Sequence, residues 1–361
     1  MTNPWAPFLT QHTASHTSSI APNQPTPNNA NTLIPLSDYR IITLSGPDAL
    51  KFLQGQCTCD FNQLAHNQWL RGAHCSPKGR MISSFTAARL AADVIGLRVH
   101  ESIATLAIKA LKKYLVFSKA QCELSELMAV GIDSITATKL NLPLQAKKAS
   151  QSPFGLLLAS PTYAEIWLTP QQLELLVTTL NPSNNSFPNP PSNSHFFTAP
   201  SVWQHIMISQ GIAEVTLRTS EQFLPQAFNY DAIEAVSFKK GCYTGQEIIA
   251  RVHYKGQSKQ RVHILQIHQQ ATKGHQQAAK IHKQAAIGQS IINDQNTVVG
   301  EVINACGNLV LACSSGYLGD KTLYLAQNSG LDESSNPLKS SNPLPISTTP
   351  LMAQELPYTL A

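Results

Sequence analysis

The chain has 361 residues, a formal charge of +5 and a hydrophobic fraction of 42%, which suits a soluble globular protein of two or three packed layers or domains. No apolar run reaches the ~18 residues of a membrane-spanning helix. The first residues have neither the basic start nor the apolar core of a signal peptide. We therefore expect a cytoplasmic protein with no membrane partner. Its mild, scattered positive charge does not identify a nucleic-acid binder.

The chain contains seven cysteines, and an odd number without a signal peptide argues against a disulfide framework. Cys57, Cys59 and Cys75 raise the alternative of a metal or cluster site. A C-x-C pair without a second pair at finger spacing is a weak signal for such a site. We therefore predict free thiols and no metal site.

The first half of the chain predicts a mixture of strands and helices. Residues 1–32 are rich in Ser, Thr, Asn, Pro and Gln and bury little apolar surface, so they predict a flexible tail. Residues 39–44 predict a strand, followed by a helix that begins after Pro47. Residues 81–91 and 94–100 predict paired strands, and 102–117 an amphipathic helix ending near Tyr114.

The second half is interrupted by two polar segments, a loop insertion at 181–195 and a flexible segment at 328–350. Between 261 and 326, short alternating runs separated by turn residues are typical of a small β-barrel or sandwich. The sequence thus predicts an α+β protein with a main region at 33–260 and a C-terminal β-barrel module at 261–361.

One segment has the composition of a chemical site: FKKGCYTGQE at 238–247. Gly241 and Gly245 flank Cys242, so the backbone can turn sharply and admit a ligand. A helix is predicted from Gln246 to about His253. Its N-terminus and the neighbouring lysines would favour a Cys242 thiolate. The alternative is that Cys242 is a small apolar residue buried at a tight turn.

The motif K-G-C-Y-x-G-Q-E resembles the signature of the YgfZ family, and the match is unbroken. Other blocks resemble the family in the same order, including ITLSGPDALKFLQGQCTCDFNQL, GAHCSPKGRM, LKKYLVFSKAQ and QFLPQAFNYDAI. The terminal ELPYTL also agrees. The resemblance covers about residues 33–326 and 355–360.

This resemblance implies the folate-binding fold of the glycine-cleavage aminomethyltransferase, closed by a C-terminal barrel. It implies tetrahydrofolate as cofactor, with Tyr39 and Trp203 at the positions of folate-flanking aromatics. A ring can stack on a pterin plane, although both residues could instead be core aromatics. Cys242 matches the essential thiol, and Gly241 shapes its loop.

The other motif residues allow two interpretations each. Gln246 and Glu247 could hold the loop or touch a ligand. Lys239, like Lys240, could meet the glutamate tail of folate or lie in solvent.

Two departures from the related proteins bear on activity. Ser209 stands where many relatives have a glutamate that can pair with the pterin. Ser83 and Ser84 lie in the strand where the transferases carry acidic residues that orient the amine. Both departures count against aminomethyl transfer.

The resemblance therefore implies a folate-binding accessory protein that supports iron–sulfur enzymes and tRNA modification. Its partners would be iron–sulfur clients such as tRNA methylthiotransferases, with no stable nucleic-acid binding, and the protein would be a monomer. The alternative is a folate-dependent one-carbon (aminomethyl) transferase.

Overall fold

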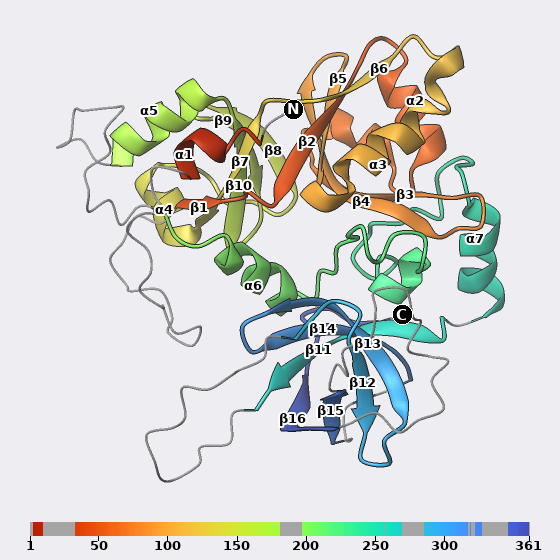
Figure 1. The fold of residues 1–361 in the computed structure, drawn as a ribbon. Coiled ribbons are helices and arrows are strands. Elements are labelled where there is room, and N and C mark those ends of the chain that lie inside the picture. Colours follow the sequence, from red (N-terminus) through yellow and green to blue (C-terminus); the bar gives the residue numbers. More distant parts are fainter. Residues whose placement is uncertain are drawn as a thin grey trace. The chain divides into compact units, whose positions relative to one another are not determined.

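The computed structural model describes residues 3–9, 33–180, 197–256, 258–268, 285–316, 318, 322–326 and 346–360 (Figure 1). The chain forms two compact units, each described here by itself. Unit 1 comprises Met1–Trp203, Val215–Glu221 and Glu234–Gln246, and unit 2 comprises Gln204–Glu214, Gln222–Ile233 and Glu247–Ala361. No helix among the described residues is both long and apolar enough to span a bilayer.

Unit 1 contains two five-stranded antiparallel sheets, of which the first has the order β3-β4-β5-β2-β6. Its strands are β2 (Tyr39–Ser45), β3 (Leu70–Cys75), β4 (Met81–Ala91), β5 (Val94–His100) and β6 (Gln121–Leu124). Helices α2 (Ala49–Gln56) and α3 (Glu101–Lys112) pack on it, and the short 3-10 helices η1 (Phe61–His66) and η2 (Leu115–Phe117) lie in its connections. The strands predicted at 39–44, 81–91 and 94–100 are confirmed.

The core of this first sheet forms because α2 and α3 each present one apolar stripe to the strands. Ala49, Phe52 and Leu53 are the buried residues of α2, and Ile103 and Leu111 belong to the buried stripe of α3.

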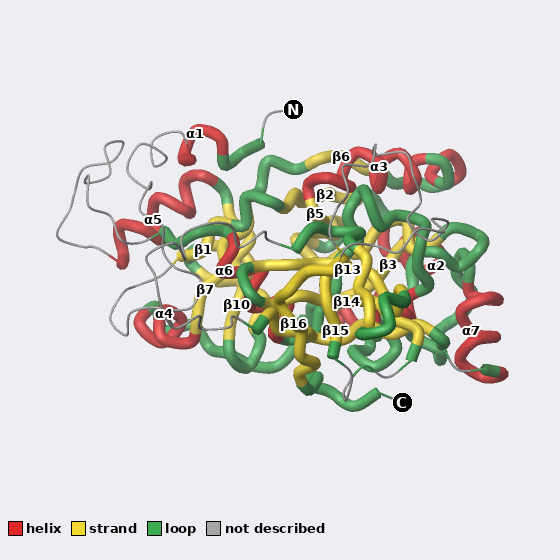
Figure 2. The backbone as a smooth tube through the Cα atoms, turned by 60° about the horizontal axis from the view of Figure 1, so that its bottom comes forward, coloured by secondary structure: helices red, strands yellow, loops and turns green. Residues whose placement is uncertain are grey.

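The second sheet of unit 1 has the order β1-β7-β10-β9-β8. Its strands are β1 (Leu33–Pro35), β7 (Met128–Asp133), β8 (Lys148–Ser152), β9 (Gly155–Ala159) and β10 (Tyr163–Leu168). Helix α4 (Ser134–Lys139) packs on β7 and β10, and α5 (Pro170–Leu180) packs on β10 (Figures 1 and 2). Strands β9 and β10 are buried along their whole length, which makes them the centre of this layer.

The prediction of a flexible tail over residues 1–32 is wrong for residues 3–9. This segment contains the helical turn α1 (Ala6–Leu9), and Trp5 is buried in the core of the second sheet. The Trp5 ring packs edge-on against Phe8 and Phe197. Burying one large aromatic side chain offsets the ordering of a few residues. Residues 10–32 and the predicted insertion at 181–195 lie outside the described residues.

Unit 2 contains a closed barrel, as predicted, with strand order β11-β14-β13-β12-β15-β16 (Figure 1). Its strands are β11 (Gln260–Ile267), β12 (Ser290–Asn293), β13 (Val298–Cys306), β14 (Leu309–Ser315), β15 (Leu323–Ala326) and β16 (Ile346–Gln354). The 3-10 helix η3 (Pro225–Phe228) precedes it, while helices α6 (Ser201–Ser209) and α7 (Gln246–Lys255) begin in unit 1 and continue into unit 2.

The prediction of a flexible segment at 328–350 is wrong for residues 346–350. These residues begin β16, whose backbone pairs with both β15 and β11. That pairing closes the barrel, and it compensates for a composition rich in Ser, Thr and Pro. Residues 328–345 lie outside the described residues.

All four tryptophans of the chain belong to unit 1. Trp5, Trp69, Trp167 and Trp203 are each exposed by 7% or less.

Candidate functional site

Cys242 is the one exposed cysteine of the seven, and the other six are buried. It lies in residues 235–245, here called the Cys242 loop, which belongs to unit 1 and leads into α7. The alternative that Cys242 is a buried apolar residue therefore does not hold. Three groups of contacts within unit 1 fix the shape of this loop.

The first anchor is the side chain of Lys240. Its Nζ donates to the carbonyl oxygens of Cys57 and Cys59, both at 2.8 Å, and lies 5.1 Å from the centroid of the Tyr243 ring. Burial lowers the pKa of Lys240, while the nearby Cys59 and Cys57 oppose this effect. The Lys240 side chain therefore holds the loop against the backbone of Cys57 and Cys59.

The backbone around Thr58 continues this anchor. The Ser237 amide donates to the Thr58 carbonyl at 2.9 Å, and the Thr58 hydroxyl donates to the Ala235 carbonyl at 2.7 Å. The segment from Cys57 to Cys59, singled out in the sequence as a weak metal motif, is a docking strip for the Cys242 loop.

The second anchor is the last turn of α2. The Thr244 amide donates to the Gly55 carbonyl at 3.3 Å, and the Thr244 hydroxyl donates to Oε1 of Gln56 at 3.0 Å. The loop is thereby tied to a helix whose opposite face is buried in the core.

The third anchor is the close approach of Gly245 to the turn between β3 and β4. Gly245 has a φ of +83°, and an added Cβ would lie 2.6 Å from the Ser76 carbonyl oxygen and 2.9 Å from the Cα of Gly79. Only glycine fits both the backbone conformation and the space. Gly241 differs, because a Cβ there would meet no described atom within 4 Å.

A set of buried polar groups lies in the same part of unit 1. Cys57, Cys59 and Cys75 are buried, and burial raises the pKa of each thiol. The Tyr243 hydroxyl and both ring nitrogens of His74 are buried without a hydrogen-bond partner among the described residues. Burial lowers the pKa of His74 to about 4, so its imidazole is neutral near pH 7. No three His, Cys, Asp or Glu side chains of the described residues are placed to hold a metal ion.

The remaining motif residues lie around the loop and at the start of α7. Lys239 is exposed, whereas Gln246 is half-buried and its amide donates to the Tyr243 carbonyl at 3.1 Å. Glu247 pairs with Arg251 one turn along α7, with 2.8 Å between Oε1 and Nη2, and both side chains are exposed. The structure therefore places Gly241, Cys242 and Lys239 at a solvent-facing turn.

Trp203, the first of the two aromatics predicted to contact folate, is 1% exposed. Its ring packs against Gly131, where a Cβ would come within 2.5 Å of it, and edge-on against Tyr163 at a centroid distance of 5.3 Å. Its indole N–H is buried and has no acceptor in the described part of the chain. Buried polar groups usually have a partner, so this N–H is a group that a bound ligand could satisfy.

Tyr39 is 6% exposed and packs in the first sheet. The Arg98 guanidinium lies 4.1 Å from its ring centroid, and His100 contacts it edge-on. Arg98 is held in turn by a buried ion pair with Glu165, with 2.7 Å between Nε and Oε1. One face of the Tyr39 ring is therefore covered by a cation.

Sequence reasoning missed the anchoring role of Lys240, the docking strip at Cys57–Cys59, and the burial of the polar groups of His74 and Tyr243. Lys239 and Lys240 look alike in the sequence, and only the fold turns one of them inward. One signal in the sequence could have indicated that part of this loop is buried. Tyr243 lies between the two glycines, and its large ring needs a surface on which to pack.

The fold of the chain belongs to a known fold class. It is similar to aminomethyltransferase T of the glycine cleavage system from Bartonella henselae, with a TM-score of 0.63 and 14% identity over 90% of this chain and 85% of that one. The predicted α+β fold of the aminomethyltransferase type with a C-terminal barrel is thereby confirmed. No family model matches the chain.

Curated relatives then identify the family. The chain is 32% identical over 239 residues to the tRNA-modifying protein YgfZ of Photobacterium profundum, covering 64% of this chain and 69% of the relative. It is 33% identical over 235 residues to the protein of the same name from Klebsiella pneumoniae, covering 63% and 69%. The chain belongs to the YgfZ family.

Proposed function

We propose that this protein is a folate-binding accessory protein that supports iron–sulfur enzymes and tRNA modification, with Cys242 as its functional thiol. The observation that carries the proposal is the placement of one exposed thiol on a loop fixed by three sets of contacts. A merely structural cysteine is normally buried, as the other six are. The relatives named tRNA-modifying proteins support the assignment to tRNA modification.

The Cys242 loop can present a thiol without moving. Lys240 and Gly245 hold its two halves, whereas the space in which a Gly241 side chain would lie is open. Once it has lost its proton, an accessible thiol can attack an electrophile, bind a partner's iron, or attack a partner's disulfide and release the other sulfur as a thiolate. Lys239, which is exposed beside it, is a contact for the anionic end of folate or of a partner.

Native-state thiol titration tests the accessibility of Cys242. A reagent such as dithiobis-nitrobenzoate should label about one thiol in the folded wild type and none in Cys242→Ser, because burial shields the rest. In cells, Cys242→Ala should lose methylthiolation of tRNA, whereas Cys306→Ala, a change at a buried barrel cysteine, should retain it. Wild-type levels of methylthiolation in Cys242→Ala would show that the thiol has no role.

Two features support folate binding, the fold of the chain and the side chain of Trp203. Proteins of this fold class include an aminomethyltransferase, and the unpartnered indole N–H of Trp203 is a suitable donor to a heterocycle. Bound tetrahydrofolate would supply one-carbon chemistry. The residues of this chain would bind and orient it, with Trp203 as donor and Tyr39 held by Arg98.

Tetrahydrofolate binding by calorimetry, comparing wild type with Trp203→Phe, tests this part. Phenylalanine keeps an aromatic ring but removes the N–H, so binding should weaken by about tenfold. Trp5→Phe is a matched control, because Trp5 is equally buried and its N–H also lacks a partner among the described residues. Equal affinity in all three proteins would remove Trp203 from the site.

The alternative of an aminomethyl transferase rests on the shared fold. In this chain the Ser84 hydroxyl accepts a hydrogen bond from the Val215 amide at 2.8 Å, and Ser83 is buried. The Ser84 hydroxyl thus has a structural partner, and neither hydroxyl can replace a carboxylate. Turnover of tetrahydrofolate with an aminomethyl donor would nonetheless establish the transferase activity.

A further inference from the structure

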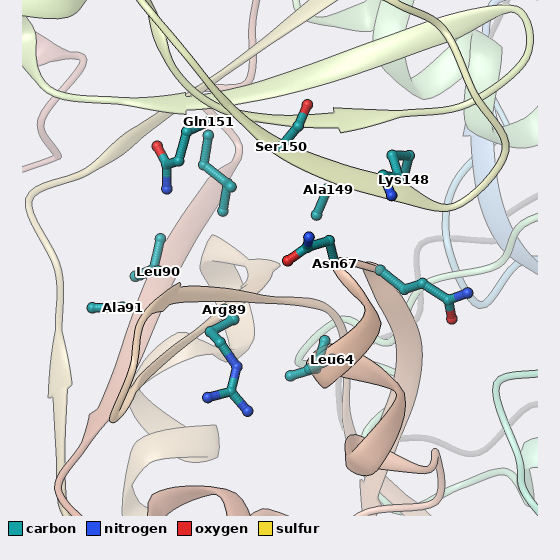
Figure 3. A pocket seen from close by; sticks show the side chains of 11 residues that line it. Leu64, Asn67, Arg89, Leu90, Ala91, Lys148, Ala149, Ser150 and Gln151 are labelled. Atoms are coloured by element: carbon teal, nitrogen blue, oxygen red, sulfur yellow. The ribbon is translucent and has the colours of Figure 1, made fainter.

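A cleft with a volume of about 360 Å³ lies within unit 1, and no residue of the Cys242 loop lines it. Its walls come from the end of η1 and the segment after it, the end of β4, and the strands β8 and β9. The lining residues are Leu64, Asn67, Gln68, Arg89, Leu90, Ala91, Lys148, Ala149, Ser150, Gln151 and Leu156 (Figure 3). Figure 3 shows Asn67 between the β8 residues on one side and Arg89 with Leu64 on the other.

The backbone fixes the walls of this cleft. The Ala149 amide donates to the Asn67 carbonyl at 2.8 Å, and Gln68 forms an isolated antiparallel bridge with Lys148. The Trp69 amide donates to the Lys147 carbonyl at 3.2 Å. Because β8 is the edge strand of its sheet, these bonds join it to the segment before β3 and hold the cleft open.

The charge of the lining is positive. Arg89 and Lys148 contribute two cations, and no acidic residue lines the cleft. Arg89 Nη1 donates to the Ala92 carbonyl at 2.6 Å, and its Nε is buried without an acceptor among the described residues. No carboxylate of the described chain forms an ion pair with Arg89 or Lys148. Within the described part of the chain, the two positive charges therefore have no carboxylate in an ion pair with them.

Neutral polar groups and apolar surface complete the lining. Asn67, Gln68, Ser150 and Gln151 bring amide and hydroxyl groups, while Leu64, Leu90 and Leu156 provide apolar contact. Small-molecule sites are typically cavities of about 300–1,000 Å³ with mostly apolar walls, whereas polar residues make up about half of this lining and favour a polar ligand. The volume of this cleft lies at the small end of that range.

We infer that this cleft binds a small organic anion carrying a phosphate or carboxylate group. The positive charges of Arg89, which can form charge-assisted hydrogen bonds, and of Lys148 attract the anionic group to the cleft. The short apolar part of the ligand lies against the leucines. This site is separate from Cys242 and does not depend on the function proposed for that thiol.

Titration calorimetry with inorganic phosphate and with succinate, at constant ionic strength with chloride as the replaced anion, tests this inference on the full chain. Saturable binding of at least one probe is expected for wild type. Arg89→Gln and Lys148→Gln should each weaken it by about tenfold, since each loses one charged contact. Lys109→Gln, which removes an exposed lysine of α3 outside the cleft, should bind as wild type does.

The arms of the experiment separate the possible outcomes. Stronger binding of phosphate than succinate assigns a phosphate-bearing ligand, and the reverse assigns a carboxylate. Unchanged circular dichroism checks the folding of each variant, and Arg89→Lys provides a milder change if Arg89→Gln fails to fold. Cys242→Ser should bind the probe unchanged. The inference is overturned by no saturable binding up to about 10 mM, or by equal weakening in Lys109→Gln.

Discussion

The two glycines beside Cys242 have different reasons to be glycine. Gly245 has a positive φ and lies against the backbone of Ser76 and Gly79, whereas Gly241 has open space around its Cα. The sequence shows the same letter at both positions, so it could predict a turn at each but could not tell which one the fold requires. Only the packing of the loop on the β3–β4 turn makes that distinction.

Gly245→Ala should therefore lower the free energy of unfolding by about 2 kcal/mol or more, because it combines an unfavourable φ with a clash against backbone atoms. Gly241→Ala should change it little. Urea denaturation followed by circular dichroism measures both values. Equal stability of the two variants would contradict the role given to Gly245 as an anchor.

His74 is a second residue whose behaviour follows from burial. The unfolded chain takes up a proton at this imidazole below about pH 6.5, whereas the folded chain does so only near pH 4 because burial lowers the pKa of His74. Between these values the unfolded state binds more protons, so the free energy of unfolding falls as the pH falls.

His74→Leu removes this contribution. On going from pH 7 to pH 5, the unfolding free energy of wild type should decrease by about 2 kcal/mol more than that of the variant. Denaturation of both proteins at the two pH values gives the difference directly, and other titrating groups cancel in the comparison. A pH dependence identical to wild type would mean that His74 reaches solvent in the folded state.

At the scale of single elements, local patterns predicted three of the five strands of the first sheet, which are β2, β4 and β5. Alternation and a turn at Ala92 are properties of neighbouring residues, so β4 and β5 are visible in the sequence. The errors concern α1 and β16, which become ordered only through contacts with residues far away in the sequence. Trp5 packs on Phe197, and β16 pairs with strands that precede it by many residues.

Trp5→Ala tests whether α1 is truly docked. Removing a fully buried aromatic side chain should cost about 3 kcal/mol of unfolding free energy. Thermal denaturation of the variant, compared with deletion of residues 1–9, measures the contribution of the segment. A loss below about 0.5 kcal/mol, the range of ordinary surface substitutions, would show that the segment is not held.

At the scale of the whole molecule, the chain passes repeatedly between its two units. Residues 215–221 return to unit 1, where the Val215 amide bonds Ser84 and the Glu221 amide donates to the Met81 carbonyl at 2.7 Å. Asn229 belongs to unit 2, where its side chain donates to the Val262 carbonyl at 2.9 Å. Such interleaving arises from contacts between residues far apart in sequence. The sequence analysis divided the chain into consecutive regions, so it did not predict this interleaving. The family motif singled out the Cys242 loop, but it did not indicate the residues that hold this loop.

The distribution of tryptophan gives this architecture a spectroscopic consequence. Because all four indoles are buried and all belong to unit 1, intrinsic fluorescence excited near the red edge of protein absorption is emitted by that unit alone. The barrel contributes to the circular dichroism but is silent in this emission. A red shift of the emission that precedes or follows the loss of dichroism would therefore reveal which unit opens first, without any label being attached to the protein.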